Sequence, residues 1–346
     1  MAQVRMNREQ FFAKLAPLGE AELRSALWTL YWRGTATMRE RVEGVVDPAE
    51  AKRAAAVAAQ PPDATTVLGD VRYFTSLVSE GAYLVGDRRV SPKERSNWRF
   101  TFRRLVTAGL DALRGDEVDT AGQALALMVD LACELQTYDN LHSDDPVEAA
   151  RFVVSDAIDQ LWTRLRQVHS PTDFLRTATA QLVRWERTYG WTRHGEGWVA
   201  ERETPLADKL ARHLTTPDLW HTAADLYVEA LDNHPADRPE SWRPSNWAAR
   251  ERSASLRIWN GLLLDHLIGP DDAVLLDLII NHPALEGADN TYLQAVLALR
   301  QGDSDQARTL IRACLTDFPG RDDFLAFGAR LGVEPPPRPT RTMVTM

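Results

Sequence analysis

The sequence reads SPKE at residues 91–94, DPVE at 145–148 and SPTD at 170–173, three copies of one short pattern. Each copy places Ser or Asp before a proline and a carboxylate three positions after that first residue. A Ser or Asp side chain accepts hydrogen bonds from the free N–H groups of a first helical turn. Proline loses nothing at the first helical position, and a carboxylate there meets the positive end of the helix dipole. The pattern therefore predicts helix starts.

Four further copies, one of them loose, extend the pattern: DPAE (47–50), TPLAD (204–208), TPD (216–218) and GPDD (269–272). The segments that follow have helical apolar period, as in a helix predicted over about 92–114. No run of alternating β-branched residues stands out, and the one candidate hairpin of strands lies near 191–198, where glycines flank a polar tip. These observations predict an all-α fold of stacked helical hairpins, resembling an α-solenoid with irregular repeats.

A weak repeat occurs near the C-terminus, where Asn-His-Pro-Ala stands at 233–236 and again at 281–284. Residues 291–333 then read TYLQAVLALRQGDSDQARTLIRACLTDFPGRDDFLAFGARLGV. Gly302-Asp303 stands at the expected turn, Ala307 in the second helix and Pro319 after that helix. This stretch resembles one tetratricopeptide repeat. The resemblance implies a helical-hairpin interaction module and no catalytic residue, while the segments upstream depart from the 34-residue spacing.

Composition sets the broad class of the protein. The chain has 346 residues, 44% of them apolar and 26% charged, which is typical of a folded globular protein. Nearly all the positive charge is arginine, as GC-rich bacterial codon usage would give. Two distant cysteines make no disulfide framework, and no apolar run approaches the length of a membrane span. We expect a cytoplasmic protein without a membrane segment.

Proline-rich breaks suggest the organisation of the chain. We expect an N-terminal helical region over 1–200, a C-terminal stack resembling helical repeats over 204–333, and a mobile proline-rich tail over 334–346.

Catalytic motifs are absent from the sequence. It holds no phosphate-binding glycine loop after a strand, no GxSxG elbow and no HExxH zinc pair. We therefore predict no catalytic residue, no metal and no cofactor. One alternative is an all-helical enzyme with an acidic site in the loop Asp139–Asp145, where carboxylates and an imidazole crowd together.

The leading hypothesis is a non-catalytic scaffold that binds a protein partner through a helical groove. Tryptophan and arginine are typical of interaction hot spots, and the chain has eleven tryptophans. Trp28 and Trp32 flank Tyr31 in one dense aromatic segment. The partner site is predicted after the proline-rich break, with these contacts: Trp242, Trp247, Arg250, Arg257 and Trp259.

The second hypothesis is binding of nucleic acid or a nucleotide. Arg95, Arg99 and Arg103 recur at four-residue spacing on a predicted helix, beside interleaved aromatic residues, and Arg88 and Arg89 precede it. Arginine forks bind phosphates and aromatic rings stack on bases. The competing interpretation is a buried aromatic face with solvated arginines beside it. The sequence leaves the partner, the process and the oligomeric state open.

Overall fold

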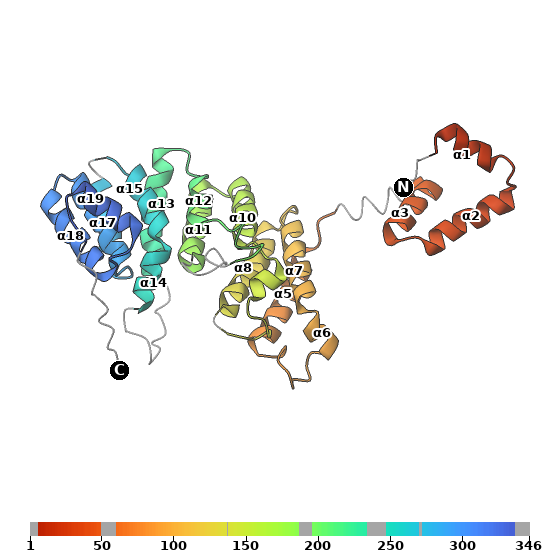
Figure 1. Ribbon diagram of the computed structural model, residues 1–346, viewed down its shortest axis with the longest axis horizontal. Coiled ribbons are helices and arrows are strands. Elements are labelled where there is room, and N and C mark those ends of the chain that lie inside the picture. The colour runs from red at the N-terminus through yellow and green to blue at the C-terminus, as the bar shows by residue number, and fades with distance from the viewer. Residues whose placement is uncertain are drawn as a thin grey trace, which may run out of the picture. The chain divides into compact units, whose positions relative to one another are not determined.

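A computed structural model describes residues 6–49, 60–136, 138–186, 196–233, 247–269 and 272–335. These residues form eighteen helices and no strand, so the predicted all-α fold is confirmed for the described chain (Figure 1). The chain divides into two compact units, Met1–Pro61 and Pro62–Met346. Among the described helices, none has both the length and the apolar character needed to cross a bilayer.

In its described residues, the first unit contains three helices: α1 (Arg8–Leu15), α2 (Glu20–Arg33) and α3 (Ala36–Val46). α2 packs against α3, and the Tyr31 hydroxyl donates to Glu43 Oε1 at 2.7 Å. Among residues 6–49 whose side chains are described, none is buried. The described part of this unit therefore has helical structure without a buried core.

The second unit contains the remaining described helices, each of which contacts at least one other helix of the unit. Within this unit, Figure 1 shows them following one another from α5, α7 and α8 to α17, α18 and α19. Their bounds are α5 (Ala64–Ser79), α6 (Pro92–Ser96), α7 (Trp98–Ala112), α8 (Val118–Leu135), α9 (Pro146–Ala150), α10 (Val154–Val168), α11 (Pro171–Trp185), α12 (Leu206–Ala211), α13 (Pro217–Asp232), α14 (Trp247–Ser255), α15 (Arg257–His266), α16 (Asp272–Ile280), α17 (Ala288–Arg300), α18 (Ser304–Asp317) and α19 (Asp322–Arg330).

One hydrophobic cluster runs through most of the second unit, from Ala64 on α5 to Leu297 on α17. A smaller cluster joins α17, α18 and α19 around Phe324. The boundary predicted between residues 200 and 204 lies within the larger cluster, and whether it separates folding units stays a prediction.

Several predicted helix starts are confirmed. α6, α9 and α11 each begin at a proline, and the preceding Ser91, Asp145 and Ser170 side chains accept hydrogen bonds from N–H groups of the first turn. The single helix predicted over 92–114 is wrong in one respect: it divides at Asn97 into α6 and α7. Asn97 leaves helical geometry (φ −104°, ψ 8°) and ends one helix while beginning the next. Asparagine favours helix formation less than alanine or leucine does, and the Asn97 side chain makes no cap hydrogen bond to α7.

The stretch that resembles a tetratricopeptide repeat forms a pair of helices, α17 and α18, which pack against each other. Gly302 turns the chain between them with φ +89°, a conformation that other residues rarely adopt. α19 packs against α18. A solenoid of such repeats is not confirmed and stays a prediction. The tip of the predicted hairpin (191–195) and most of the predicted tail (336–346) lie outside the described residues.

Candidate functional site

Trp259, predicted to contact a partner, lies in the core. Its side chain is fully buried on α15, with its ring centroid 5.8 Å from that of Trp220 and 6.2 Å from that of Tyr227. The Trp259 ring is therefore not exposed to a partner that docks on the surface, and its contact with a partner stays a prediction.

Arg257 is engaged inside the protein. Its guanidinium lies over the rings of Tyr292 and Phe324, at 4.6 and 5.6 Å from their centroids. It also forms ion pairs with Asp289 and Asp323. Burial alone would raise the pKa of Asp323, but its hydrogen bond and ion pair with Arg257, together with the charge of Arg321, hold that pKa below its ordinary value. Arg257 therefore links α15 to α17 and α19. Its guanidinium group is largely engaged by these contacts and not by a partner.

The other two described residues of this predicted site do not form a continuous binding surface with Trp259 and Arg257. Trp247 begins α14 and is partly exposed. The aliphatic stem of Arg250 lies beside Gly287, because a Cβ added there would meet Arg250 Cγ at 3.1 Å. Trp242 lies outside the described residues. The four described residues thus divide between the core (Trp259), an internal ion-pair cluster (Arg257) and the surface (Trp247 and Arg250).

Two arginines of the predicted phosphate-binding stripe donate to backbone carbonyls. Arg95 donates to the carbonyl of Leu84 at 3.2 Å. Arg103 donates to the carbonyls of Ala149 and Ala150, at 2.8 and 2.7 Å, and thereby closes the C-terminal end of α9. Helix-terminal carbonyls lack intrahelical partners, so these contacts stabilise the fold.

The remaining arginines of that stripe differ from one another. Arg89 bonds to Asp87 and lowers the pKa of that carboxyl. Arg88 is exposed, and Arg99 is exposed above the ring of Phe100, at 4.9 Å from its centroid. Nucleic-acid binding remains an untested prediction; of the five arginines, Arg88, Arg89 and Arg99 are exposed, and Arg89 is paired with Asp87.

The acidic loop Asp139–Asp145 is organised by its own backbone. Asp139 Oδ1 accepts from the Ser143 N–H at 3.3 Å, and Asp145 Oδ1 accepts from the Glu148 N–H at 2.9 Å as the cap of α9. In the described part of the chain, no three His, Cys, Asp or Glu side chains lie close enough together to hold a metal ion. An enzymatic role for this loop stays a prediction.

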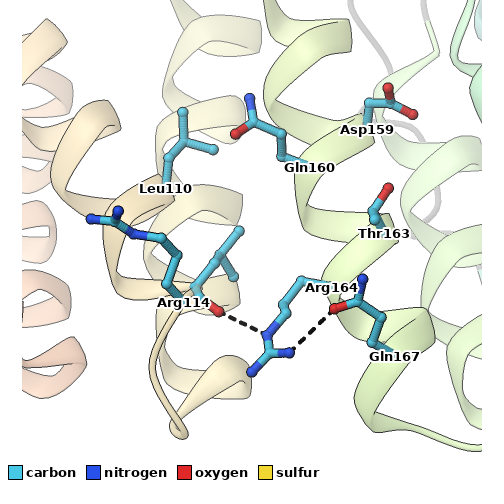
Figure 2. A pocket seen from close by; sticks show the side chains of 8 residues that line it. Leu110, Arg114, Asp159, Gln160, Thr163, Arg164 and Gln167 are labelled. Atoms are coloured by element: carbon cyan, nitrogen blue, oxygen red, sulfur yellow. Dashed lines mark hydrogen bonds between the residues drawn. The ribbon is translucent and has the colours of Figure 1, made fainter. Parts of the chain in front are cut away.

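A shallow groove of about 460 Å³ lies between the end of α7 and the outer face of α10 (Figure 2). Arg164 crosses its floor and donates to the carbonyl of Leu113 at 2.9 Å and to Gln167 Oε1 at 3.2 Å, as Figure 2 shows. Arg114 pairs with Asp111 at 3.0 Å. Both guanidinium groups are thus occupied, and no nucleophile–base pair faces the groove.

The most unusual surface in the described chain lies on α2. The Trp28 ring stacks on Tyr31 and on Trp32, with centroid separations of 5.8 and 5.6 Å, yet Trp28 is 59% exposed and Trp32 70% exposed. Leu27 and Leu30, on the same helix, are also about half exposed. Large contiguous apolar patches are rare on soluble monomers and mark interaction surfaces.

The sequence marks Trp28–Trp32 as a dense aromatic segment but does not place it in the predicted partner site. At about 100° per residue, the apolar side chains of α2 spread over more than half of the helix circumference. A helix that is apolar over so wide an arc is usually covered on more than one side. That width was the signal that could have found the surface.

Comparison with known protein families, with curated proteins and with solved structures finds no match to this chain.

Proposed function

We propose that this protein is a non-catalytic scaffold, acting in the cytoplasm, whose N-terminal helices dock onto a protein partner through the aromatic surface of α2. The observation that supports the proposal is the exposure of Trp28 and Trp32 in a unit without a buried side chain among its described residues. Tryptophan in a cluster of apolar neighbours is the side chain most enriched in binding hot spots.

The energetic reason is the cost of leaving apolar surface in water. Each fully buried large apolar side chain contributes about 1.5–3 kcal/mol relative to its exposed state. The first unit gains little of this energy by itself, since even Leu27 and Leu30 stay half exposed. Covering α2 with a partner would supply the missing burial and stabilise the three helices at the same time.

The test is capture of the tagged full-length protein from its own cells, with nuclease treatment, followed by mass spectrometry. The wild type is compared with the double variant Trp28→Ser/Trp32→Ser. Val85→Ser is the matched control, because Val85 is 84% exposed on the second unit, away from α2 in sequence. Circular dichroism and thermal unfolding of each variant show whether the second unit stays folded.

We expect one stoichiometric protein that survives nuclease, is retained by Val85→Ser and is lost from the double variant. Loss of one hot-spot tryptophan costs about 2 kcal/mol, which is a roughly 30-fold weaker affinity. Two results contradict the proposal: undiminished capture by the double variant, or no stoichiometric protein in any capture. Material released by nuclease would instead favour the nucleic-acid alternative.

A further inference from the structure

α16 is an apolar helix with one side uncovered. Its sequence, DAVLLDLII, is apolar except for two aspartates, a composition typical of helices that are covered all round. Leu276, Ile279 and Ile280 are buried, whereas Val274 is 78% exposed and Leu278 is 51% exposed. Val274 and Leu278 are four residues apart, so they form one exposed apolar stripe along the helix.

α13 lies beside α16 along the length of both helices. His221 Nε2 lies 2.9 Å from Asp272 Oδ1 near their N-terminal ends, and His282 Nε2 lies 3.1 Å from Asp232 Oδ1 beyond their C-terminal ends. The two helices therefore run side by side in the same direction. Asp225 follows His221 by one turn on α13 and is exposed, so its carboxylate borders the α16 side of the pair.

The charge of this pair of helices is one-sided. Together they carry six carboxylates and neither contains a lysine or an arginine. Within the described chain, no lysine or arginine forms an ion pair with any of the six. The carboxylates are Asp218, Asp225, Glu229, Asp232, Asp272 and Asp277.

We propose that the α13–α16 face, defined by Val274, Leu278, Asp225 and Asp277, binds a basic amphipathic helix of a protein partner. Apolar residues of the incoming helix would pack along the stripe, and its lysines or arginines would meet the flanking carboxylates. A second copy fits this face poorly, because a twofold contact would bring identical carboxylates together. This surface belongs to the second unit and α2 to the first. The inference does not depend on the function proposed for α2.

The test uses the full chain and a fluorescein-labelled synthetic amphipathic helix about five turns long, with leucines on one face and lysines on the other. A matched peptide carries glutamates in place of the lysines. Fluorescence anisotropy gives the affinities, at low and at high salt. The protein variants are Val274→Ser/Leu278→Ser for the stripe and Asp225→Asn/Asp277→Asn for its rim, with Val85→Ser as the control for an exposed apolar residue elsewhere.

We expect the basic peptide to bind and the acidic peptide not to bind. The stripe variant should bind at least about tenfold more weakly, since both apolar contacts are removed. The rim variant should lose part of the salt dependence, since two exposed charges no longer attract the peptide. Val85→Ser and Trp28→Ser/Trp32→Ser should bind like the wild type, which separates this inference from the function proposed for α2.

Four results would overturn the inference. The first is that the basic peptide does not bind the folded protein, and the second is that the basic and acidic peptides bind with equal affinity. The third is that the basic peptide binds the stripe variant as tightly as the wild type, which would mean that net charge alone attracts it. The fourth is a wild-type dimer in sedimentation that Val274→Ser/Leu278→Ser dissociates, because the occupant would then be a second copy. Circular dichroism and thermal unfolding establish that each variant is folded before its affinity is compared.

Discussion

The carboxylate of Glu203 accepts hydrogen bonds from the backbone N–H groups of Val154 and Ser155, at 2.5 and 3.1 Å. Glu203 is buried and lies 49 residues beyond Val154 in the chain. α10 has no side-chain cap of its own, because Val153 stands at its N-cap position. A distant glutamate thus takes over the capping function that Ser or Asp performs at other helices of this protein.

Replacing Glu203 with alanine should destabilise the second unit by about 2–4 kcal/mol, because two buried N–H groups lose their acceptor. Urea unfolding followed by circular dichroism measures the change. Glu201→Ala is the matched control, since Glu201 is exposed two residues earlier and should unfold like the wild type. Equal unfolding midpoints for the two variants would show that Glu203 does not stabilise α10.

Trp259→Ala should cost about 3–5 kcal/mol of unfolding free energy, because it removes a fully buried indole between Trp220 and Tyr227. Trp247→Ala should cost at most about 1 kcal/mol, because the Trp247 ring is partly exposed. Chemical denaturation of both variants checks the difference. Similar costs for both would contradict the assignment of Trp259 to the core.

Arg103→Ala should lower stability by about 1.5–3 kcal/mol, since a charged donor to two carbonyls at the end of α9 is lost. Arg99→Ala should leave stability unchanged, because Arg99 is exposed. Thermal unfolding measures both, and anisotropy with labelled RNA is recorded alongside. Arg103→Ala could instead unfold like the wild type and bind RNA more weakly in a salt-dependent way. That result would mean that Arg103 serves RNA binding rather than stability through its contacts with Ala149 and Ala150.

His213 should make the protein less stable in mild acid. Its ring lies against Phe174 at 5.2 Å between centroids, its Nε2 has no hydrogen-bond partner, and burial lowers its pKa below the ordinary value of about 6.5. Below pH of about 6.5 the unfolded chain therefore gains a proton at this residue before the folded protein does. The stability that neutral His213 contributes is therefore lost as the pH falls from about 6.5, the pKa in the unfolded chain, through the lower pKa of His213 in the folded protein.

His213→Phe, which cannot titrate, should unfold with a smaller loss of stability between pH 7 and pH 5 than the wild type. His142→Asn is the control, since His142 is an exposed histidine with positive φ, a conformation that asparagine tolerates. An unchanged pH slope in His213→Phe would mean that His213 takes up its proton equally in both states.

The sequence predicted the local helix starts because their causes lie within four residues. Ser91, Asp145 and Ser170 cap the helices that begin at the next residue, as their spacing from a proline and an acid indicated. The predicted functional residues were less reliable, because composition does not tell which face of a helix is covered. Trp259 and Trp28 are the same residue type in helical segments, yet one is fully buried and the other is exposed.

By itself, the sequence determined the helical class of the described chain and the places where α6, α9, α11 and α13 begin, since capping, proline geometry and apolar period act over one or two turns. The tertiary structure alone decided that Glu203 caps α10, that Arg257 lies over the rings of Tyr292 and Phe324, and that α16 leaves Val274 in water. Those outcomes depend on contacts between segments that are far apart in the sequence, and a local sequence pattern does not predict such contacts.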